Sequence, residues 1–276
     1  MAPIPRLLAA LLLAVVAVPT AAQEPAPIVI GQSWRLASTT LGAERTINVW
    51  VPPSYAEGER RYSVLYIVDG GLQQDFHHIS GLAQLGSIST LIADMIVVGI
   101  ETVDRRRELT FAPERDARRL LRQFPTAGHA ATFRRHLLDE VKPFIEGRYR
   151  TSGDDAIIGE SLAGLFIVDT FLREPAAFDT YIAISPSLWW DNGGLPLRAP
   201  ALLAAHDDAP RRLWLSIADE GGQMQAGMDR LVAALRDRPS RTLTWRYEPR
   251  PDLTHGSIYH GNAFEALQAL YPRPEE

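Results

Sequence analysis

A glutamate and a serine interrupt an apolar run in the stretch AIIGESLAGLF, residues 156–166. Gly159 and Ala163 place very small residues two positions before and two positions after Ser161. This spacing is typical of a sharp strand-to-helix turn that projects the serine hydroxyl above the edge of a sheet. The usual pattern has glycine at the second position, and alanine is small enough to replace it. Ser161 is therefore a candidate nucleophile, and an ordinary helix N-cap is the alternative.

A neutral serine hydroxyl is a poor nucleophile, so a catalytic serine needs a histidine to take its proton. In enzymes with this turn the chain order is serine, then acid, then histidine. His255 and His260 are the two histidines that follow the last predicted strand. We predict His255 as the base, because it stands in a predicted loop before Gly256, whereas His260 lies near the start of the next predicted helix.

The acid that orients the histidine is expected at the end of the strand RLWLSI, where Asp219 and Glu220 are adjacent. We favour Glu220. Asp219 remains an alternative, as does Asp252, which stands three residues before His255. A Ser–His dyad, with a backbone carbonyl or a water orienting the imidazole, is also compatible with the sequence.

An acyl-transfer site also needs N–H donors for the negative charge that develops on the carbonyl oxygen. The backbone N–H of Leu162, directly after the serine, is one predicted donor. The second is expected in the turn after the buried strand SVLYIVDGG, where Gly71 permits unusual backbone angles and close ligand approach.

The elements around these residues alternate between β-branched runs and helical patterns, which predicts an α/β fold with a mostly parallel sheet covered on both faces. The carboxyl ends of such strands collect the reactive groups. One helix is expected over residues 131–149, and two more over Met224–Arg236 and Asn262–Tyr271. The predicted strands are Thr46–Pro52, Tyr62–Gly71, Met95–Glu101, the start of the stretch that holds Ser161, Tyr181–Ser187, Arg212–Glu220 and Thr242–Glu248.

The first 22 residues have the three-part pattern of a secretory signal peptide: Arg6, an apolar run over Leu7–Val18, and small residues up to Ala22. The run is shorter than the ~20 residues that span a bilayer, which favours cleavage after Ala22 over a membrane anchor. The sequence has no cysteine, which excludes a lipid-modified cysteine and any disulfide. We expect a single domain over residues 23–276, located in the periplasm or, as second choice, secreted.

Several motifs together resemble the putative esterase family of α/β-hydrolases, which includes enterochelin and salmochelin esterases, esterase D and mycolyltransferases. The match is strongest to the periplasmic, IroE-like siderophore esterases. The resemblance implies an α/β-hydrolase fold, Ser161 as nucleophile, His255 as base, and Gly71 and Leu162 as oxyanion donors. It also implies that the third acid, here Glu220, is weak or absent in some members. The motifs are VLYIVDGG, DRRRELT, FRRHLLDEVKPFIEGRYRT, IIGESLAGLF, AISPSLWWDNG and THGS.

Residues 104–122 contain seven arginines and four acids, a local charge of +3 in a chain whose net charge is −5. Arg105 and Arg107 are therefore predicted to bind an anionic group of the substrate, with a solvated helix face as the alternative. Trp189 and Trp190, after a predicted strand, are candidates to stack on an aromatic acyl group. Burial in the core is the more common outcome for such tryptophans.

We therefore predict a serine carboxylic-ester hydrolase that forms an acyl-enzyme and acts on a siderophore-type or other small anionic or aromatic ester. An acyltransferase with the same nucleophile and a non-catalytic periplasmic binding protein are the alternatives. The negative net charge gives no case for nucleic acid or acidic membranes as partners. No cofactor or metal is expected, because the sequence has neither a glycine-rich phosphate loop nor an HExxH motif.

Overall fold

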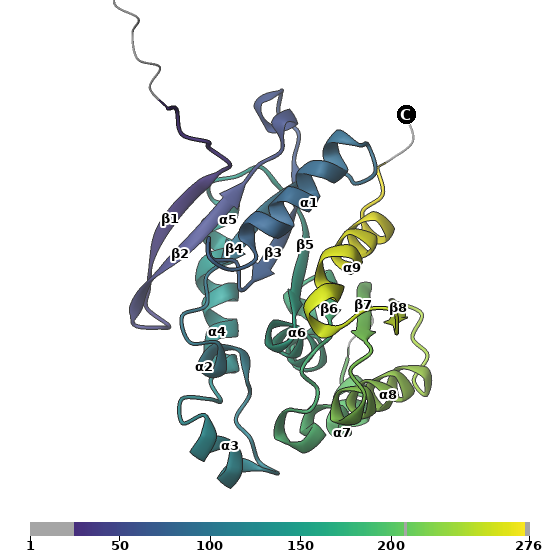
Figure 1. The fold of residues 1–276 in the computed structure, drawn as a ribbon. Coiled ribbons are helices and arrows are strands. Elements are labelled where there is room, and N and C mark those ends of the chain that lie inside the picture. The colour runs from purple at the N-terminus through teal and green to yellow at the C-terminus, as the bar shows by residue number, and fades with distance from the viewer. Residues whose placement is uncertain (1–24, 207–208, 274–276) are drawn as a thin grey trace, which may run out of the picture. The chain divides into compact units, whose positions relative to one another are not determined.

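An eight-stranded sheet, in the order β1-β2-β4-β3-β5-β6-β7-β8, organises the chain from Gly31 onward (Figure 1). β1 pairs antiparallel with β2 and β2 with β4, whereas every later pairing is parallel. The expected mostly parallel α/β sheet is thus confirmed. The strands are β1 (Gln32–Ser38), β2 (Ala43–Trp50), β3 (Tyr62–Val68), β4 (Met95–Ile100), β5 (Thr151–Glu160), β6 (Thr180–Ile184), β7 (Arg211–Ala218) and β8 (Leu243–Arg250).

This computed structural model describes residues 25–206 and 209–273. Gly31–Glu276 forms one compact unit. The predicted signal peptide, residues 1–22, lies outside the described residues. Among the described helices, none has both the length and the apolar character that crossing a bilayer would require.

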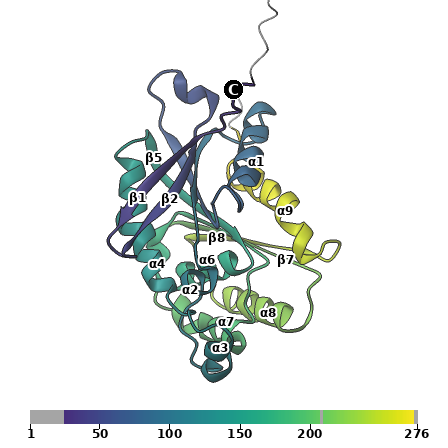
Figure 2. The ribbon, with the colours of Figure 1, turned by 60° about the vertical axis from the view of Figure 1, so that its left-hand side comes forward.

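Helices cover both faces of the sheet. The helices are α1 (Phe76–Ile88), α2 (Arg105–Leu109), α3 (Ala117–Gln123), α4 (Ala130–His136), α5 (Lys142–Glu146), α6 (Leu162–Arg173), α7 (Trp190–Leu203), α8 (Gly222–Arg236) and α9 (His255–Leu270). α1 and α9 pack side by side on one face, and α2 to α8 lie on the other (Figures 1 and 2). The strands in between are therefore shielded from water on both sides, as parallel sheets require.

The alternation of side chains along β3 shows how the sequence builds the two layers. Leu65 and Ile67 belong to the core under α1 and α9, whereas Val64, Tyr66 and Val68 belong to the core under α4 to α8. Successive side chains of a strand point to opposite faces. The continuous apolar run of β3 therefore contributes side chains to both cores. This explains why no polar residue interrupts it.

Several elements differ from the sequence-based expectation. The helix expected over residues 131–149 is divided into α4, a π-helical turn (Leu137–Val141) and α5. In that turn the Lys142 N–H donates to the Leu137 carbonyl five residues before it. Pro143 follows immediately and has no N–H to continue the regular α-helical ladder. The segment Gln32–Ser38, for which no strand was predicted, is the edge strand β1. The helices α1, α2, α3 and α7 were likewise not predicted as bounded elements.

Candidate active site

Ser161 occupies a strained turn between β5 and α6. Its backbone angles are φ 61° and ψ −117°, outside the regions that a serine ordinarily adopts. Two backbone hydrogen bonds hold the turn: the Ser161 N–H donates to the Ile184 carbonyl at 3.0 Å, and the Ser161 carbonyl accepts from the Leu165 N–H at 2.9 Å. The hydroxyl is thus presented at the carboxyl end of β5 by a backbone that both a strand and a helix fix in place.

Small residues permit this turn because helix and strand approach each other closely. A Cβ atom added to Gly159 would lie 2.6 Å from the Cβ of Ala163. A Cβ added to Gly164 would lie 3.0 Å from both the Ile184 carbonyl oxygen and the Pro186 Cα. Any larger residue at these positions would push α6 away from the sheet, which explains the spacing of small residues around Ser161.

His255 joins the serine to an acid. Its Nε2 lies 3.0 Å from Ser161 Oγ, and its Nδ1 lies 3.0 Å from Glu220 Oε1. An ionised carboxylate only accepts hydrogen bonds, so Nδ1 carries the proton and Nε2 is left to accept from the serine. The hydrogen bond to Glu220 raises the pKa of His255, and partial burial opposes that shift. The structure therefore brings all three predicted residues into one chain of hydrogen bonds.

The histidine is fixed by the start of a helix rather than by a loop, contrary to the sequence-based expectation. α9 begins at His255 itself, after Thr254 as N-cap. Thr254 and Ser257 form a capping box, which satisfies free N–H groups of the first turn. The other candidate base, His260, lies further along α9, where its Nδ1 is 3.0 Å from Nε2 of His78 on α1.

The alternative acids lie in different environments. The Asp252 carboxylate is exposed and forms an ion pair with Arg250 at 2.9 Å. The backbone N–H of Asp219 donates to the Leu253 carbonyl at 2.9 Å, which ties the end of β7 to the segment before α9. This link holds Glu220 and His255 at a fixed separation.

A second carboxylate, that of Glu160, borders the imidazole, and no role was predicted for it. Glu160 Oε1 lies 3.9 Å from His255 Nε2. Burial raises the pKa of Glu160 to about 7, and the positive charge of His255 acts against this shift. The charges of Asp75 and Glu220 raise the pKa of Glu160 further, whereas Arg105 lowers it. The only sequence signal was its position directly before the nucleophile.

The two predicted oxyanion donors differ in whether their backbone N–H already has a hydrogen-bond partner. Leu162 is the first residue of α6, so its N–H has no carbonyl partner within the helix, and it borders the hollow that contains Ser161. The Gly71 N–H instead donates to Gln74 Oε1 at 2.9 Å, and Gln74 Nε2 donates to the Thr102 carbonyl. The prediction that the Gly71 N–H is an oxyanion donor is therefore not met in this structure, because that N–H already donates to the Gln74 side chain.

A hollow of about 230 Å³, here called the Ser161 hollow, opens over these groups. Of the residues predicted to bind substrate, Arg105 and Trp189 line it. Arg106, Ser187 and Met224 line it without having been predicted, and Ser187 Oγ lies 3.3 Å from Ser161 Oγ. The full lining is Arg105, Arg106, Ser161, Leu162, Ser187, Trp189, Glu220, Met224 and His255.

Two predicted substrate residues lie elsewhere and are corrected. Trp190 is fully buried, and its Nε1–H donates to the Phe111 carbonyl at 3.0 Å, so it belongs to the core. Arg107 is exposed and does not line the hollow. On the short helix α2, consecutive residues point in directions about 100° apart, so only part of the arginine run can face the serine.

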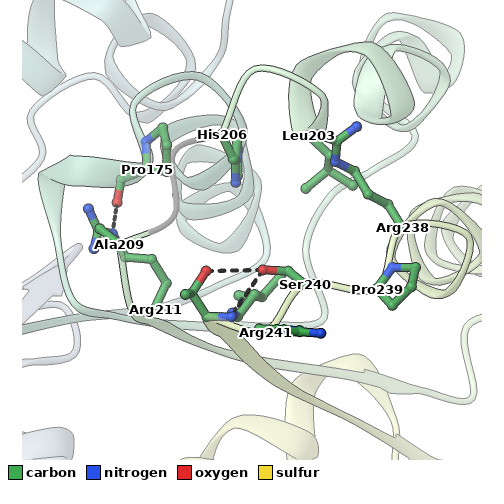
Figure 3. Close-up of a pocket in the computed structure, with 11 residues that line it drawn as sticks. Pro175, Leu203, His206, Ala209, Arg211, Arg238, Pro239, Ser240 and Arg241 are labelled. Carbon is green, nitrogen blue, oxygen red and sulfur yellow. Dashed lines mark hydrogen bonds between the residues drawn. The ribbon is translucent and has the colours of Figure 1, made fainter.

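A larger hollow of about 440 Å³, here called the Ser240 hollow, lies at the opposite edge of the sheet. It is lined by His206, Ser240 and several arginines, beside the first residues of β7 and β8 (Figure 3). The Ser240 hydroxyl contacts Thr242 Oγ1 at 3.1 Å and accepts the Thr242 and Leu243 N–H groups, so it ends the turn before β8. Reactive sites of parallel sheets form at the carboxyl ends of strands, which favours the smaller hollow.

Within the described ranges, no group of three or more His, Asp or Glu side chains is arranged to hold a metal ion. The chemistry that this arrangement supports is nucleophilic attack by a serine, with a histidine as base and a carboxylate to orient the base.

Several known proteins are similar to this chain in sequence or in fold. The chain is 31% identical over 164 residues to ferri-bacillibactin esterase BesA of Bacillus subtilis; the match covers 53% of this chain and 55% of BesA, so about half the length of that relative. The crystal structure of an IroE-like serine hydrolase from Shewanella oneidensis is 26% identical, with a TM-score of 0.78, and the match covers 87% of this chain and 80% of that one. Siderophore hydrolase EstB from Aspergillus nidulans, 20% identical, has the same fold, with a TM-score of 0.75 and coverage of 91% and 99%.

These neighbours identify the fold as that of the α/β-hydrolases. The sequence model of the family described as "Putative esterase" matches residues 38–237, well over half of the chain. The matched segment includes the strained serine turn and Glu220, and His255 follows it. The chain belongs to the putative esterase family.

Proposed function

We propose that the protein is a serine carboxylic-ester hydrolase in which Ser161 forms the acyl-enzyme. One observation carries this proposal: a continuous chain of hydrogen bonds from Ser161 Oγ through His255 to Glu220, with both links at 3.0 Å. The family membership supports the reaction class.

The geometry gives each group a role in acylation. As Ser161 Oγ attacks the ester carbonyl carbon, Nε2 of His255 takes the hydroxyl proton. Glu220 holds the neutral imidazole with its proton on Nδ1 and stabilises the imidazolium that forms. The imidazolium then gives its proton to the departing alkoxide, which leaves as the alcohol, and the acyl group stays on the serine oxygen.

Deacylation reverses these roles with water. His255 takes a proton from the incoming water, whose oxygen attacks the acyl carbon, and returns a proton to Ser161 as the acid product leaves. We expect the Leu162 N–H, at the start of α6 beside Ser161, to donate to the carbonyl oxygen as it becomes negative in both steps. One such donor typically contributes ~3 kcal/mol of transition-state stabilisation.

The substrate class that we propose is a small ester with an anionic or aromatic group, of the siderophore type. Two arginines and Trp189 line the Ser161 hollow. The hollow is smaller than the ~300–1,000 Å³ of a typical small-molecule site, so only one arm of a large ester would enter it. The names of two of the similar proteins support this class: ferri-bacillibactin esterase BesA and siderophore hydrolase EstB.

We also propose that the protein is exported to the periplasm after removal of residues 1–22. The support is the sequence pattern of Arg6, the apolar run and the small residues before Gln23. Fractionation of a bacterial host, followed by N-terminal sequencing of the protein, tests this proposal. A periplasmic product that begins at Gln23 is expected, and an uncleaved cytoplasmic product would contradict it.

The experiment that tests the hydrolase proposal is stoichiometric labelling with a fluorophosphonate, a reagent that reacts with activated serines. Wild-type protein should take up one label, and Ser161→Ala should take up none. Ser240→Ala is the matched control, because that serine lies beside a histidine in the other hollow, and it should label like wild type. Absence of labelling in folded wild-type protein would favour a binding protein.

Product analysis with an alcohol acceptor present separates hydrolysis from acyl transfer. We expect free acid as the main product. A dominant new ester would instead assign the same acyl-enzyme to an acyltransferase.

A further inference from the structure

Two adjacent arginines border the Ser161 hollow, and their partners differ. Arg105 forms a salt bridge within the protein: its Nε and Nη2 donate to Asp69 Oδ2 at 2.8 and 2.7 Å. Asp69 follows β3 and is buried, with only 5% of its side chain exposed. The charge of Arg105 is thus largely satisfied within the protein.

Arg106 has no such partner. Its guanidinium carbon lies 4.4 Å from the centroid of the Phe124 ring, and its side chain is half-buried. Among the residues that the structure describes, no carboxylate forms an ion pair with it. Burial lowers the pKa of Arg106, and the neighbouring charge of Arg105 acts in the same direction.

A partly desolvated cation without an acid is unfavourable, because burial removes water that would otherwise stabilise the charge. The ring of Phe124 offsets part of this cost through a cation–π contact. That contact leaves the edge of the planar guanidinium, with its forked N–H donors, free to bind a carboxylate or a similar anion. The missing partner is therefore expected to come from outside the protein.

We propose that Arg106 binds an anionic group on the ester and thereby selects substrates that carry a negative charge close to the scissile bond. This inference rests on the proposed function, because it assigns a specificity role at the same hollow. Trp189 and Met224, which also line the hollow, supply apolar surface for the carbon skeleton that joins the anion to the ester.

The test uses pairs of esters that differ only in charge. On the acyl side the pair is the 4-nitrophenyl ester of 4-carboxybenzoate and its neutral carboxamide counterpart, 4-nitrophenyl 4-carbamoylbenzoate. On the alcohol side the pair is 4-carboxyphenyl butyrate and 4-carbamoylphenyl butyrate. Each pair has nearly the same shape, so a difference in kcat/KM reports the charge, and the two pairs show on which side of the ester the anion binds.

We expect wild-type protein to prefer the carboxylate of at least one pair. Arg106→Gln should lower kcat/KM for that carboxylate ester by about tenfold or more, the usual effect of losing a charge-assisted hydrogen bond. It should leave the carboxamide ester within about twofold. Arg107→Gln removes the same charge from an exposed neighbour that does not line the hollow, and it should leave both esters within about twofold.

Arg106→Lys is a second variant that retains the charge and the aliphatic stem over Phe124. It keeps the proposal testable if the glutamine variant does not fold. It should keep the preference for the carboxylate but weaken it, because an ammonium group lacks the planar fork. A lysine variant with no preference, in protein that still hydrolyses the neutral ester, would contradict the proposal.

Three further results would overturn the assignment of Arg106: equal loss on both members of a pair, an equal effect of Arg107→Gln, or no preference in wild type on either side. In each of these cases the wild-type protein still hydrolyses the neutral ester. Failure of the proposed function differs from them, because neither ester would then be hydrolysed in a manner that depends on Ser161.

Discussion

The Ser161 hollow and the Ser240 hollow differ in size and in how their polar side chains are bonded. The Ser240 hollow is nearly twice as large as the Ser161 hollow, and it contains a serine, a histidine and several arginines. Its serine, however, bonds to the start of β8, and its His206 Nε2 lies 3.3 Å from the Leu172 carbonyl. In the smaller hollow the serine, histidine and acid bond to one another. The geometry of side chains, rather than volume, locates the chemistry.

Strained backbone conformations also occur at the carboxyl edge of the sheet, where the Ser161 hollow lies. Three non-glycine residues with positive φ directly follow parallel strands at the carboxyl edge: Asp69 after β3, Ser161 after β5 and Ser185 after β6. Each has a defined task there, since Asp69 binds Arg105 and Ser185 Oγ accepts the Ala218 N–H. Strained backbone of this kind persists only where the surrounding structure holds it, and it gathers at functional sites.

The largest difference between the hollows is expected from their histidines. His255→Ala should lower kcat by a factor on the order of 10⁴, because the serine then loses the hydrogen-bonded base that takes its proton. His206→Ala removes the histidine of the Ser240 hollow and should leave kcat within about twofold. Steady-state kinetics with a 4-nitrophenyl ester measures both. An equal loss in the two variants would remove the distinction between the hollows.

Glu220→Gln should have the next largest effect, between ~10²- and ~10⁴-fold on kcat, because the imidazole loses the group that fixes its tautomer. The acid also raises the pKa of His255. Catalysis needs the neutral imidazole, so activity is lost as pH falls through that pKa. Removing Glu220 lowers the pKa, and the acidic limb of the pH–rate profile should move to lower pH.

Asp252→Asn serves as the control for this variant, because the Asp252 carboxylate pairs with Arg250 on the surface. It should leave both the rate and the acidic limb unchanged. A large loss in Asp252→Asn with little change in Glu220→Gln would assign the orienting role to the other acid.

Glu160→Gln is expected to have a moderate effect of about threefold to tenfold, because its carboxylate lies close to Nε2 without a direct hydrogen bond. Burial raises the pKa of Glu160 to about 7, so the group is neutral below that pH and anionic above it. The anion stabilises the imidazolium, so wild-type kcat should rise as pH increases through about 7. In the glutamine variant the contribution of Glu160 to that rise should disappear, while the acidic limb that His255 sets should remain. A profile identical to wild type would show that Glu160 does not act on His255.

The smallest effect is expected from the arginines of the Ser240 hollow. Arg238→Gln and Arg241→Gln should each leave kcat/KM within about twofold for neutral and anionic esters alike, because these side chains lie at the amino ends of the strands. A selective loss on anionic esters in either variant would instead place substrate binding in the larger hollow.

The local patterns of the sequence were sufficient to predict much of the fold and several members of the site. Continuous apolar runs marked the buried strands, since such strands need apolar side chains on both faces. Small residues around Ser161 marked the turn, because contacts between α6 and β5 leave no room for larger ones. Chain order then limited the base to His255 or His260 and pointed to the end of β7 for the acid, without separating Asp219 from Glu220. The structure joins His255 to Ser161 and Glu220 to His255.

What the sequence could not predict depends on tertiary orientation. Arg105, Arg106 and Arg107 are identical in type, and only the packing of α2 decides which of them line the hollow. Trp189 and Trp190 are likewise adjacent in the sequence, yet Trp189 borders the hollow and Trp190 is in the core.

The N–H of Gly71 was predicted correctly as part of a turn after β3, but its partner is the side chain of Gln74. A hydrogen bond between side chain and backbone of this kind leaves no periodic signal in the sequence. For the same reason the proximity of Glu160 to His255, which depends on how α9 meets the end of β5, became visible only in the structure.

Trapping the acyl-enzyme is the most direct test of the claim that Ser161 is the nucleophile. Wild-type protein is mixed with a slowly hydrolysed ester, quenched in acid within the first turnover, digested, and mapped by mass spectrometry. We expect one acyl group per protein, attached to the hydroxyl of Ser161 in the peptide that contains this residue. An acyl group on Ser187, whose oxygen lies only 3.3 Å away, or on Ser240, or no acyl group during active turnover, would contradict it.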